Sequence, residues 1–341
     1  MSTAKELLRI TASQLSRLLP YNMLSVFAGQ KLLIPLYHVV SDTEVPHIKH
    51  LYQVKTTKQF NKDLDFLLKY YEPIHYLELE KLVLSKSKIR KPCFLLTFDD
   101  GLREFYDVIA PILQQRSIPA ICFLNSAFID NKALFYRYKV SLLLNHISKY
   151  KLSIQHSVEQ WLSAKVNKRV DLKRLLLSIT YSEVPILDEL AAYLSINFDE
   201  YLSDRKPYLT SNQIIELQGK GFCFGGHSID HPRYCLLNFD EQIRQTQLCM
   251  EHICKHFSIN YKAFAFPFSD EGVTVDFFDK IYNNHIIDIS FGTAGLKKDN
   301  FMQHLQRIPM ERAEMLAERI IKEQMLICTI RNMLGRNIIA R

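Results

Sequence analysis

The chain has 341 residues, 48% of them hydrophobic and 23% charged, which is enough for one large α/β domain or two smaller ones. The net charge is +7, but no run of Lys and Arg typical of nucleic-acid binding occurs, so we expect no nucleic-acid partner. No apolar run approaches the ~20 residues of a membrane span, and no secretory signal is visible. We therefore expect a cytoplasmic protein with reduced cysteines.

The N-terminal half begins with helical and strand-like patterns in alternation. Residues 3–19 carry the capping spacing and apolar stripe of an amphipathic helix, which either packs on its own domain or anchors at an interface. A buried strand is expected over 31–40, with His38 near its end. A helix beginning near Thr56 and a short strand at 74–77 follow.

The next strand, 94–98, ends abruptly in two adjacent carboxylates, Asp99 and Asp100. Neighbouring carboxylates repel, so holding both at a strand end costs free energy unless a cation or a proton offsets the charge. Asp and Gly are also common in ordinary turns, so this motif alone is ambiguous. A helix and a buried strand at 119–125 come next, and this succession predicts a parallel sheet.

The alternation breaks between about 132 and 206, where the apolar spacing is helical. We interpret this segment as an insertion that covers one face of the parallel core, where it either shapes substrate binding or adds stability. Strand-like runs then end at His227 and Pro267, and a last one spans 305–309. A helical stripe at 313–334 closes the chain.

His227 and His231 are four residues apart, so both imidazoles can face one point. Two histidines and a carboxylate form a hydrolytic metal site that keeps one coordination position open. In isolation this spacing is more often a surface accident. The groups at Asp99, His227 and Pro267 each follow a strand, however, and ligands gather at the carboxyl ends of parallel strands. We therefore expect them to converge in one site.

Two motifs carry a resemblance to a known family. Thr-Phe-Asp-Asp-Gly at 97–101 and His-Ser-Ile-Asp-His-Pro at 227–232 resemble the first two motifs of the polysaccharide deacetylases, carbohydrate esterase family four, which includes the nodulation chitooligosaccharide deacetylases. Phe-Ala-Phe-Pro-Phe at 264–268 resembles a variant of the third motif. Tyr-His-Val-Val at 37–40 is similar to the start of many such domains.

The resemblance implies an α/β fold, a distorted (β/α) barrel of parallel strands with a helical insertion. Accordingly, residues 31–312 form the expected deacetylase-type barrel, interrupted by the insertion at about 132–206. Residues 1–30 are assigned to an N-terminal helix and 313–341 to a C-terminal helix.

The resemblance further implies a divalent metal, most commonly Zn²⁺, held by Asp100, His227 and His231. Asp99 is then the general base that deprotonates the attacking water. This division is physically sensible, because the cation neutralises one carboxylate and leaves its neighbour free to take a proton.

The remaining roles match the family less well. The oxyanion formed by attack on an acetyl carbonyl would be held by the metal and by a backbone N–H near Pro267 and Phe268. The usual third-motif arginine is absent, and Arg307 is the candidate to reach the same place. The late histidine motif that supplies a general acid also has no clear match. His38 is the better candidate to line the site, whereas His304 is interpreted as a surface histidine.

These assignments predict a metal-dependent hydrolase that removes acetyl groups from N-acetylated sugars of a poly- or oligosaccharide or a glycan precursor. The alternatives are an O-acetyl sugar esterase and a non-catalytic carbohydrate-binding protein on the same fold. The expected partner is an acetylated glycan. The amphipathic ends leave a peripheral membrane contact open.

Overall fold

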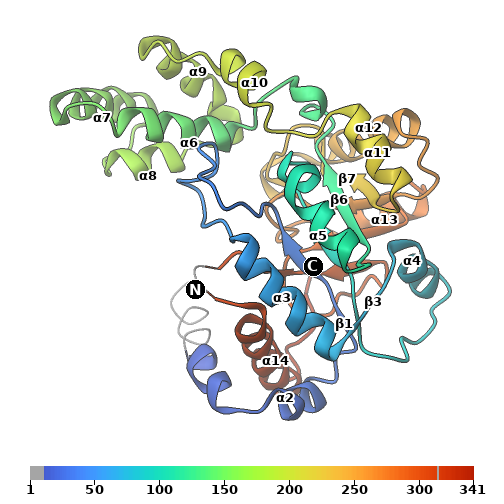
Figure 1. Cartoon of the computed structure of the whole chain (residues 1–341). Coiled ribbons are helices and arrows are strands. Elements are labelled where there is room, and N and C mark those ends of the chain that lie inside the picture. Colours follow the sequence, from blue (N-terminus) through green and yellow to red (C-terminus); the bar gives the residue numbers. More distant parts are fainter. Residues whose placement is uncertain (1–10, 313–314) are drawn as a thin grey trace.

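The structure is a computed structural model that describes residues 11–312 and 315–341 (Figure 1). The first part of the helix expected over 3–19 lies outside the described residues, and 11–18 are helical. In the described part of the chain, no helix is both long and apolar enough to cross a membrane.

Eight strands form one parallel sheet in the order β10-β9-β8-β7-β6-β5-β2-β11. Their bounds are β2 (Pro35–Tyr37), β5 (Leu96–Phe98), β6 (Ala120–Leu124), β7 (Cys223–Gly226), β8 (Ala263–Ala265), β9 (Ile289–Gly292), β10 (His304–Gln306) and β11 (Ile308–Pro309). Strands β10 and β11 stand at opposite ends of this order, yet only Arg307 separates them in the chain. The sheet therefore curves until its edges meet, which gives the expected distorted (β/α) barrel.

Two of the expected strands are each divided between two sheets. The run at 31–40 forms β1 (Leu32–Leu33) before β2, and the run ending in the two aspartates forms β4 (Cys93–Phe94) before β5. β4 is the middle strand of a small parallel sheet, in which it pairs with β1 on one side and with β3 (Glu72–Pro73) on the other. One residue separates the two halves of each run, and it carries the chain from the small sheet into the barrel.

The strand expected at 74–77 is wrong. β3 ends at Pro73, and α4 (Tyr76–Leu84) begins directly afterwards. The physical reason is a helix cap, because the His75 side chain accepts a hydrogen bond from the Leu77 backbone N–H.

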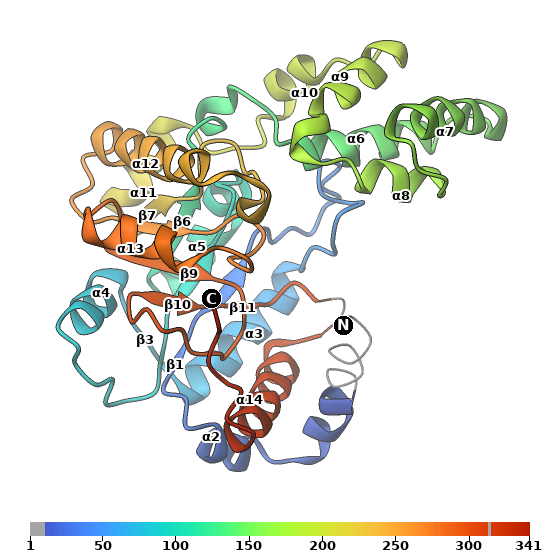
Figure 2. The same cartoon turned by 180° about the vertical axis from the view of Figure 1, so that it is seen from behind.

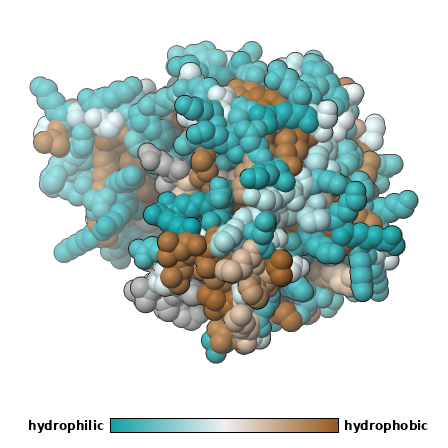
Figure 3. Space-filling model, turned by 60° about the horizontal axis from the view of Figure 1, so that its bottom comes forward, coloured by the Kyte–Doolittle hydropathy of each residue, from teal (hydrophilic) through white to brown (hydrophobic). Residues whose placement is uncertain are grey.

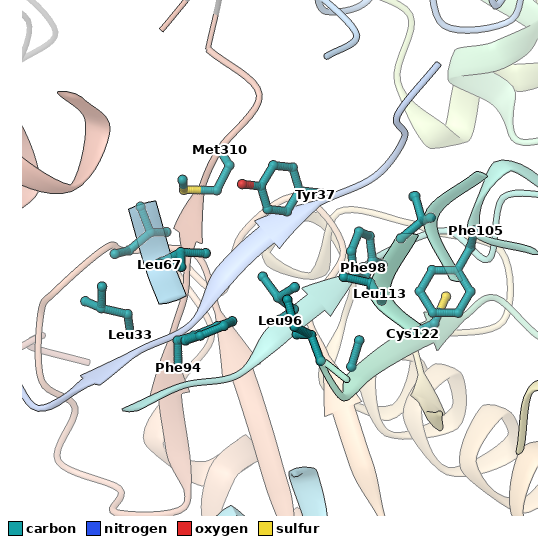
Figure 4. Packing of buried hydrophobic residues seen from close by; sticks show 14 of the residues in the cluster. Leu33, Tyr37, Leu67, Phe94, Leu96, Phe98, Phe105, Leu113, Cys122 and Met310 are labelled. Atoms are coloured by element: carbon teal, nitrogen blue, oxygen red, sulfur yellow. The ribbon is translucent and has the colours of Figure 1, made fainter. Parts of the chain in front are cut away.

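Helices surround the barrel, and the apolar core lies between them and the sheet. The outer helices are α2 (Tyr21–Ala28), α3 (Thr57–Tyr70), α4, the π-helical η1 (Phe105–Ile109) with α5 (Ala110–Gln115), α11 (Ser211–Gly219), α12 (Phe239–His256), α13 (Val275–Asn283) and α14 (Ala317–Met333). Successive side chains along each strand point to opposite faces of the sheet. Leu96, Phe98 and Cys122 pack against the helices with Leu67 (Figure 4), whereas Phe123 lies in a separate cluster inside the barrel.

Five helices between β6 and β7 form a lobe that stands away from the barrel (Figures 1 and 2). They are α6 (Tyr136–Ile147), α7 (Leu152–Val166), α8 (Leu172–Leu177), α9 (Val184–Tyr193) and α10 (Phe198–Arg205). Their apolar side chains cluster with one another and with Val39, Val45 and Ile48 of the loop that follows β2. The expectation that the insertion covers a face of the sheet is therefore wrong, because this lobe packs on a loop at the carboxyl end of the barrel.

Candidate active site

The predicted site residues meet at the carboxyl ends of the barrel strands. Asp99 and Asp100 follow β5, His227 follows β7, and His38 follows β2. Arg307 occupies the seam between β10 and β11. Parallel strands bring their carboxyl ends to one edge, so groups that are far apart in the sequence come together here.

Asp100, His227 and His231 form a buried triad. The Asp100 Oδ1 atom lies 3.6 Å from His227 Nε2 and 3.3 Å from His231 Nε2. The ligand atoms of all three side chains lie within 4.8 Å of one another. Asp100 and His231 both adopt left-handed backbone conformations, with φ of 69° and 63°. Such strain in residues other than glycine gathers at functional sites.

Neighbouring groups orient this triad. His227 Nδ1 lies 2.7 Å from the Ala265 carbonyl oxygen and donates to it, which leaves Nε2 with a lone pair directed at Asp100. The Tyr138 hydroxyl, from α6 of the insertion, donates to Asp100 Oδ2 at 2.6 Å. Asp100 Oδ1 is buried and accepts no hydrogen bond from any residue that the structure describes. A carboxylate oxygen left in this way beside two imidazoles fits a divalent cation.

The protonation states of His227 and Asp100 also fit a divalent cation. Burial lowers the pKa of His227 to about 4, so this imidazole is neutral at neutral pH, which is the form that binds metal. Burial raises the pKa of Asp100, but the electrostatic attraction of the neighbouring His231 lowers it by more, and the carboxyl stays ionised.

Asp99 is held by a separate partner. Arg307 donates to both of its oxygens, from Nη1 to Oδ1 at 2.6 Å and from Nη2 to Oδ2 at 2.9 Å. Arg307 is fully buried, and its Nε donates to the Gly292 carbonyl at 3.2 Å. Burial raises the pKa of Asp99, but the Arg307 charge opposes this effect, and with the nearby His227 the net pKa falls below its usual value. Asp99 is therefore an ionised carboxylate.

His38 is paired with an acid that sequence analysis did not identify. Its Nδ1 lies 2.5 Å from Glu311 Oε2, and Glu311 Oε1 accepts the backbone N–H groups of His38 and Val39 at 2.7 and 2.9 Å. Burial lowers the pKa of His38, but the Glu311 carboxylate raises it more, to about 9. His38 is therefore protonated at neutral pH. Glu311 lies five residues beyond β10, and a carboxylate just after the last strands is the one signal that could have indicated it.

Four of the site residues line a pocket of about 420 Å³ and form its polar side: His38, Asp99, Asp100 and His231. Much of the remaining lining is apolar or aromatic. The insertion supplies one wall, formed by Phe135, Arg137, Tyr138 and Leu177. No sequence signal marked Tyr138 or Arg137, because the contact between the insertion and the barrel is long-range.

Phe268 and Pro267 differ in their relation to the pocket. Phe268 lines it and packs edge-on against His231, with 4.6 Å between the ring centroids. Its φ is 59°, and its backbone N–H donates to no group of the described residues. Pro267 is buried beside it and does not line the pocket. The free N–H of Phe268 is thus a donor that a substrate oxygen can use.

His304 is not a surface histidine, and that interpretation is wrong. Its side chain is buried, with Nε2 3.0 Å from Asp270 Oδ2 and Nδ1 2.6 Å from the Ser290 hydroxyl. Asp270 and Asp299 also share Arg341, whose Nη2 lies 2.5 and 2.6 Å from their oxygens. The three residues Asp270, Asp299 and His304 have the spacing of metal ligands, but the guanidinium already supplies their positive charge.

Comparisons with known proteins agree with this geometry. The family model described as polysaccharide deacetylase matches residues 86–283. No curated protein matches the chain. The chain is similar to the Streptococcus pyogenes deacetylase PplD in complex with acetate (16% identity, 86% of this chain and 98% of that chain covered, TM-score 0.55). It is also similar to IcaB from Ammonifex degensii (14% identity, 87% and 98% covered, TM-score 0.54). At these identities the likeness concerns the fold.

Proposed function

Because the chain belongs to the polysaccharide deacetylase family, we propose that it is a metal-dependent hydrolase that removes acetyl groups from N-acetylated sugars of a glycan or glycan precursor. One observation carries the proposal. An ionised carboxylate, Asp99, lines the same pocket as Asp100 and His231 of the buried triad, and Asp100 Oδ1 has no hydrogen-bond partner among the described residues. An ionised carboxylate beside a candidate cation site is the arrangement that hydrolysis of an amide requires.

Asp100, His227 and His231 would hold the divalent cation, which we propose to be Zn²⁺. Such a cation polarises a carbonyl and lowers the pKa of water. The Zn²⁺ assignment rests on the donor set, because one carboxylate and two imidazoles are ligands that zinc accepts while keeping a position open.

The other side chains divide the proton transfers. Asp99 accepts the proton of the attacking water, and Arg307 keeps this carboxylate ionised and fixes its orientation. The oxygen of the water bonds to the acetyl carbon, and the C–N bond breaks. His38, protonated because Glu311 stabilises its charge, donates its proton to the departing amine nitrogen. The Phe268 N–H donates to the oxyanion formed in between.

The test combines metal analysis with acetate release. Purified protein should hold close to one divalent metal per chain and release acetate from N-acetylated oligosaccharides faster than from O-acetylated ones. Asp99→Asn should keep the metal and lose about 10²–10⁴-fold in rate. The exposed Asp240→Asn is the matched control and should behave as wild type. A wild-type protein that binds no metal, or an Asp99→Asn variant of full activity, would falsify the mechanism. Faster release from O-acetyl sugars would make the protein an esterase.

A further inference from the structure

One end of the molecule is built from two segments that lie far apart in the sequence, 11–31 and 324–341. The first contains α2, and the second contains the last turns of α14 and the residues that follow. The two helices lie side by side in both views (Figures 1 and 2). Gln30 Nε2 donates to Cys328 Sγ at 3.6 Å, and the Arg319 guanidinium donates to the Ser13 hydroxyl at 3.3 Å. The two segments therefore form one continuous face, which we call the α2–α14 face.

Large apolar side chains project from this face. Leu18 is 82% exposed, Val26 78%, Phe27 60%, Met333 76% and Leu334 62%. Hydrophobic side chains gather on the lower face of the molecule, where α2 and α14 lie (Figure 3). Single exposed apolar residues are ordinary, but a contiguous group of this size marks an interaction surface.

The charge of the α2–α14 face is of one sign. Neither segment contains Asp or Glu, although 36 of the chain's 341 residues are acidic. Arg17, Lys31 and Arg336 are exposed there, and Arg331 is half-buried. Among the described residues, no carboxylate pairs with Arg17, Arg331 or Arg336. Within the described part of the chain, these cations therefore border the apolar group without a paired carboxylate.

We propose that the α2–α14 face docks on an anionic lipid bilayer. Helices with apolar side chains bordered by Arg and Lys bind at the boundary between lipid headgroups and acyl chains, and each cation near an anionic leaflet adds to the attraction. A second copy of this chain fits the face less well. A two-fold contact between two such faces would bring like charges together, and the segments 11–31 and 324–341 supply no carboxylate to offset them.

Vesicle sedimentation tests the proposal, with full-length protein and vesicles of phosphatidylcholine alone or with phosphatidylserine added. Wild type should bind only the vesicles with phosphatidylserine, and added salt should weaken binding. The double variant Val26→Ser with Phe27→Ser should bind these vesicles at least about tenfold more weakly than wild type, because the apolar contact is lost. Arg17→Glu with Arg336→Glu should abolish the preference for phosphatidylserine. Leu152→Ser, which removes an apolar side chain of 81% exposure from α7, is the matched control and should bind as wild type.

Three results would overturn the proposal. They are no binding to either vesicle, equal binding to both, or variants on this face that bind as wild type. Analytical ultracentrifugation addresses the alternative occupant, because a dimer abolished by Val26→Ser with Phe27→Ser, without vesicle binding, would assign the face to a second copy. Acetate release from soluble oligosaccharides should be equal in all these variants, so failure of membrane docking is distinguishable from failure of the proposed hydrolysis.

Discussion

The barrel contains two clusters of aspartate and histidine, and they differ in what completes them. Around Asp270, the imidazole of His304 and the guanidinium of Arg341 occupy one carboxylate oxygen, and the Thr293 N–H donates to the other at 3.3 Å. Around Asp100, a tyrosine occupies one oxygen and, within residues 11–312 and 315–341, the other accepts no hydrogen bond. Both clusters bring three Asp and His side chains within ligand spacing, one Asp with two His around Asp100 and two Asp with one His around Asp270. The difference teaches that an unpartnered buried oxygen, and not the presence of Asp and His, indicates the cation site.

The same contrast explains why the adjacent carboxylates Asp99 and Asp100 can be buried together. Arg307 neutralises the first through a bidentate pair, whereas Arg341 reaches the Asp270 carboxylate through Nη2 alone. The second is left for the proposed metal. In the proposed mechanism, one residue of separation therefore decides which carboxylate would act as a base and which as a ligand, because only Asp99 is paired with the arginine at the barrel seam.

The largest expected effects come from removing one carboxylate of each cluster. Asp100→Ala should lose bound metal and more than about 10³-fold of acetate release, with little change in the free energy of unfolding. The Asp270→Ala variant should keep the metal bound at Asp100, His227 and His231. It should lose about 3–5 kcal/mol of unfolding free energy, because Arg341 and His304 lose a buried partner. Metal content and denaturant unfolding of the two variants measure the contrast. Metal loss in Asp270→Ala, or an equal loss of stability in both, would contradict it.

Substitutions of Arg307 test whether its salt bridge to Asp99 lowers the pKa of the proposed base. In Arg307→Met, burial acts on Asp99 without the opposing cation, so its pKa rises. The acidic limb of the kcat/KM profile should then move to higher pH, and the rate at neutral pH should fall about 10–100-fold. Arg307→Lys keeps the charge without the bidentate geometry, so it should lower the rate while leaving the limb near its wild-type position. An acidic limb that stays in place in Arg307→Met would exclude this role.

Sequence patterns predicted the part of the site that is local in the chain. Asp99 with Asp100, and His227 with His231, are each contained in one short motif at a strand end, so their convergence follows from a parallel sheet. Arg307 could also be proposed, since it lies within the last strand-like run, 305–309. The barrel itself was predicted for the same reason, because alternating strands and helices specify a parallel sheet.

The parts that were missed depend on contacts between distant segments. Tyr138 reaches Asp100 only because the insertion folds back onto the end of the barrel, and Glu311 reaches His38 only because β11 lies beside β2. His304 was misinterpreted because its burial follows from packing against Asp270. Whether a polar residue is buried and paired is set by tertiary structure, which periodicity does not encode.

A substitution of Glu311 tests whether His38 is the proposed general acid. The pKa of His38, about 9 in the folded protein, lies above the usual value because of the Glu311 carboxylate. As a proton donor, His38 should keep the enzyme active up to about pH 9, and the alkaline limb should fall there. Glu311→Gln removes the charge, so the limb should move down toward pH 6.5 or below. The pair also stabilises the fold fully below pH 6.5, and this contribution is lost as pH rises through about 9. If Glu311→Gln leaves both the alkaline limb and this pH dependence unchanged, His38 is not the acid.

The smallest expected effect tests whether the insertion contributes to the cation site. Tyr138→Phe removes the hydroxyl that fixes Asp100 Oδ2, so the apparent metal affinity should fall about tenfold. The rate at saturating metal should change little, because the ligand atoms remain. Tyr150→Phe is the matched control, since its hydroxyl bonds to His146 within the insertion. If chelator titrations give equal affinities for the two variants, the insertion forms only a wall of the pocket. A selective loss in Tyr138→Phe would instead show that the lobe helps to prepare the unpartnered Asp100 oxygen, the feature that distinguishes this cluster from the one around Asp270.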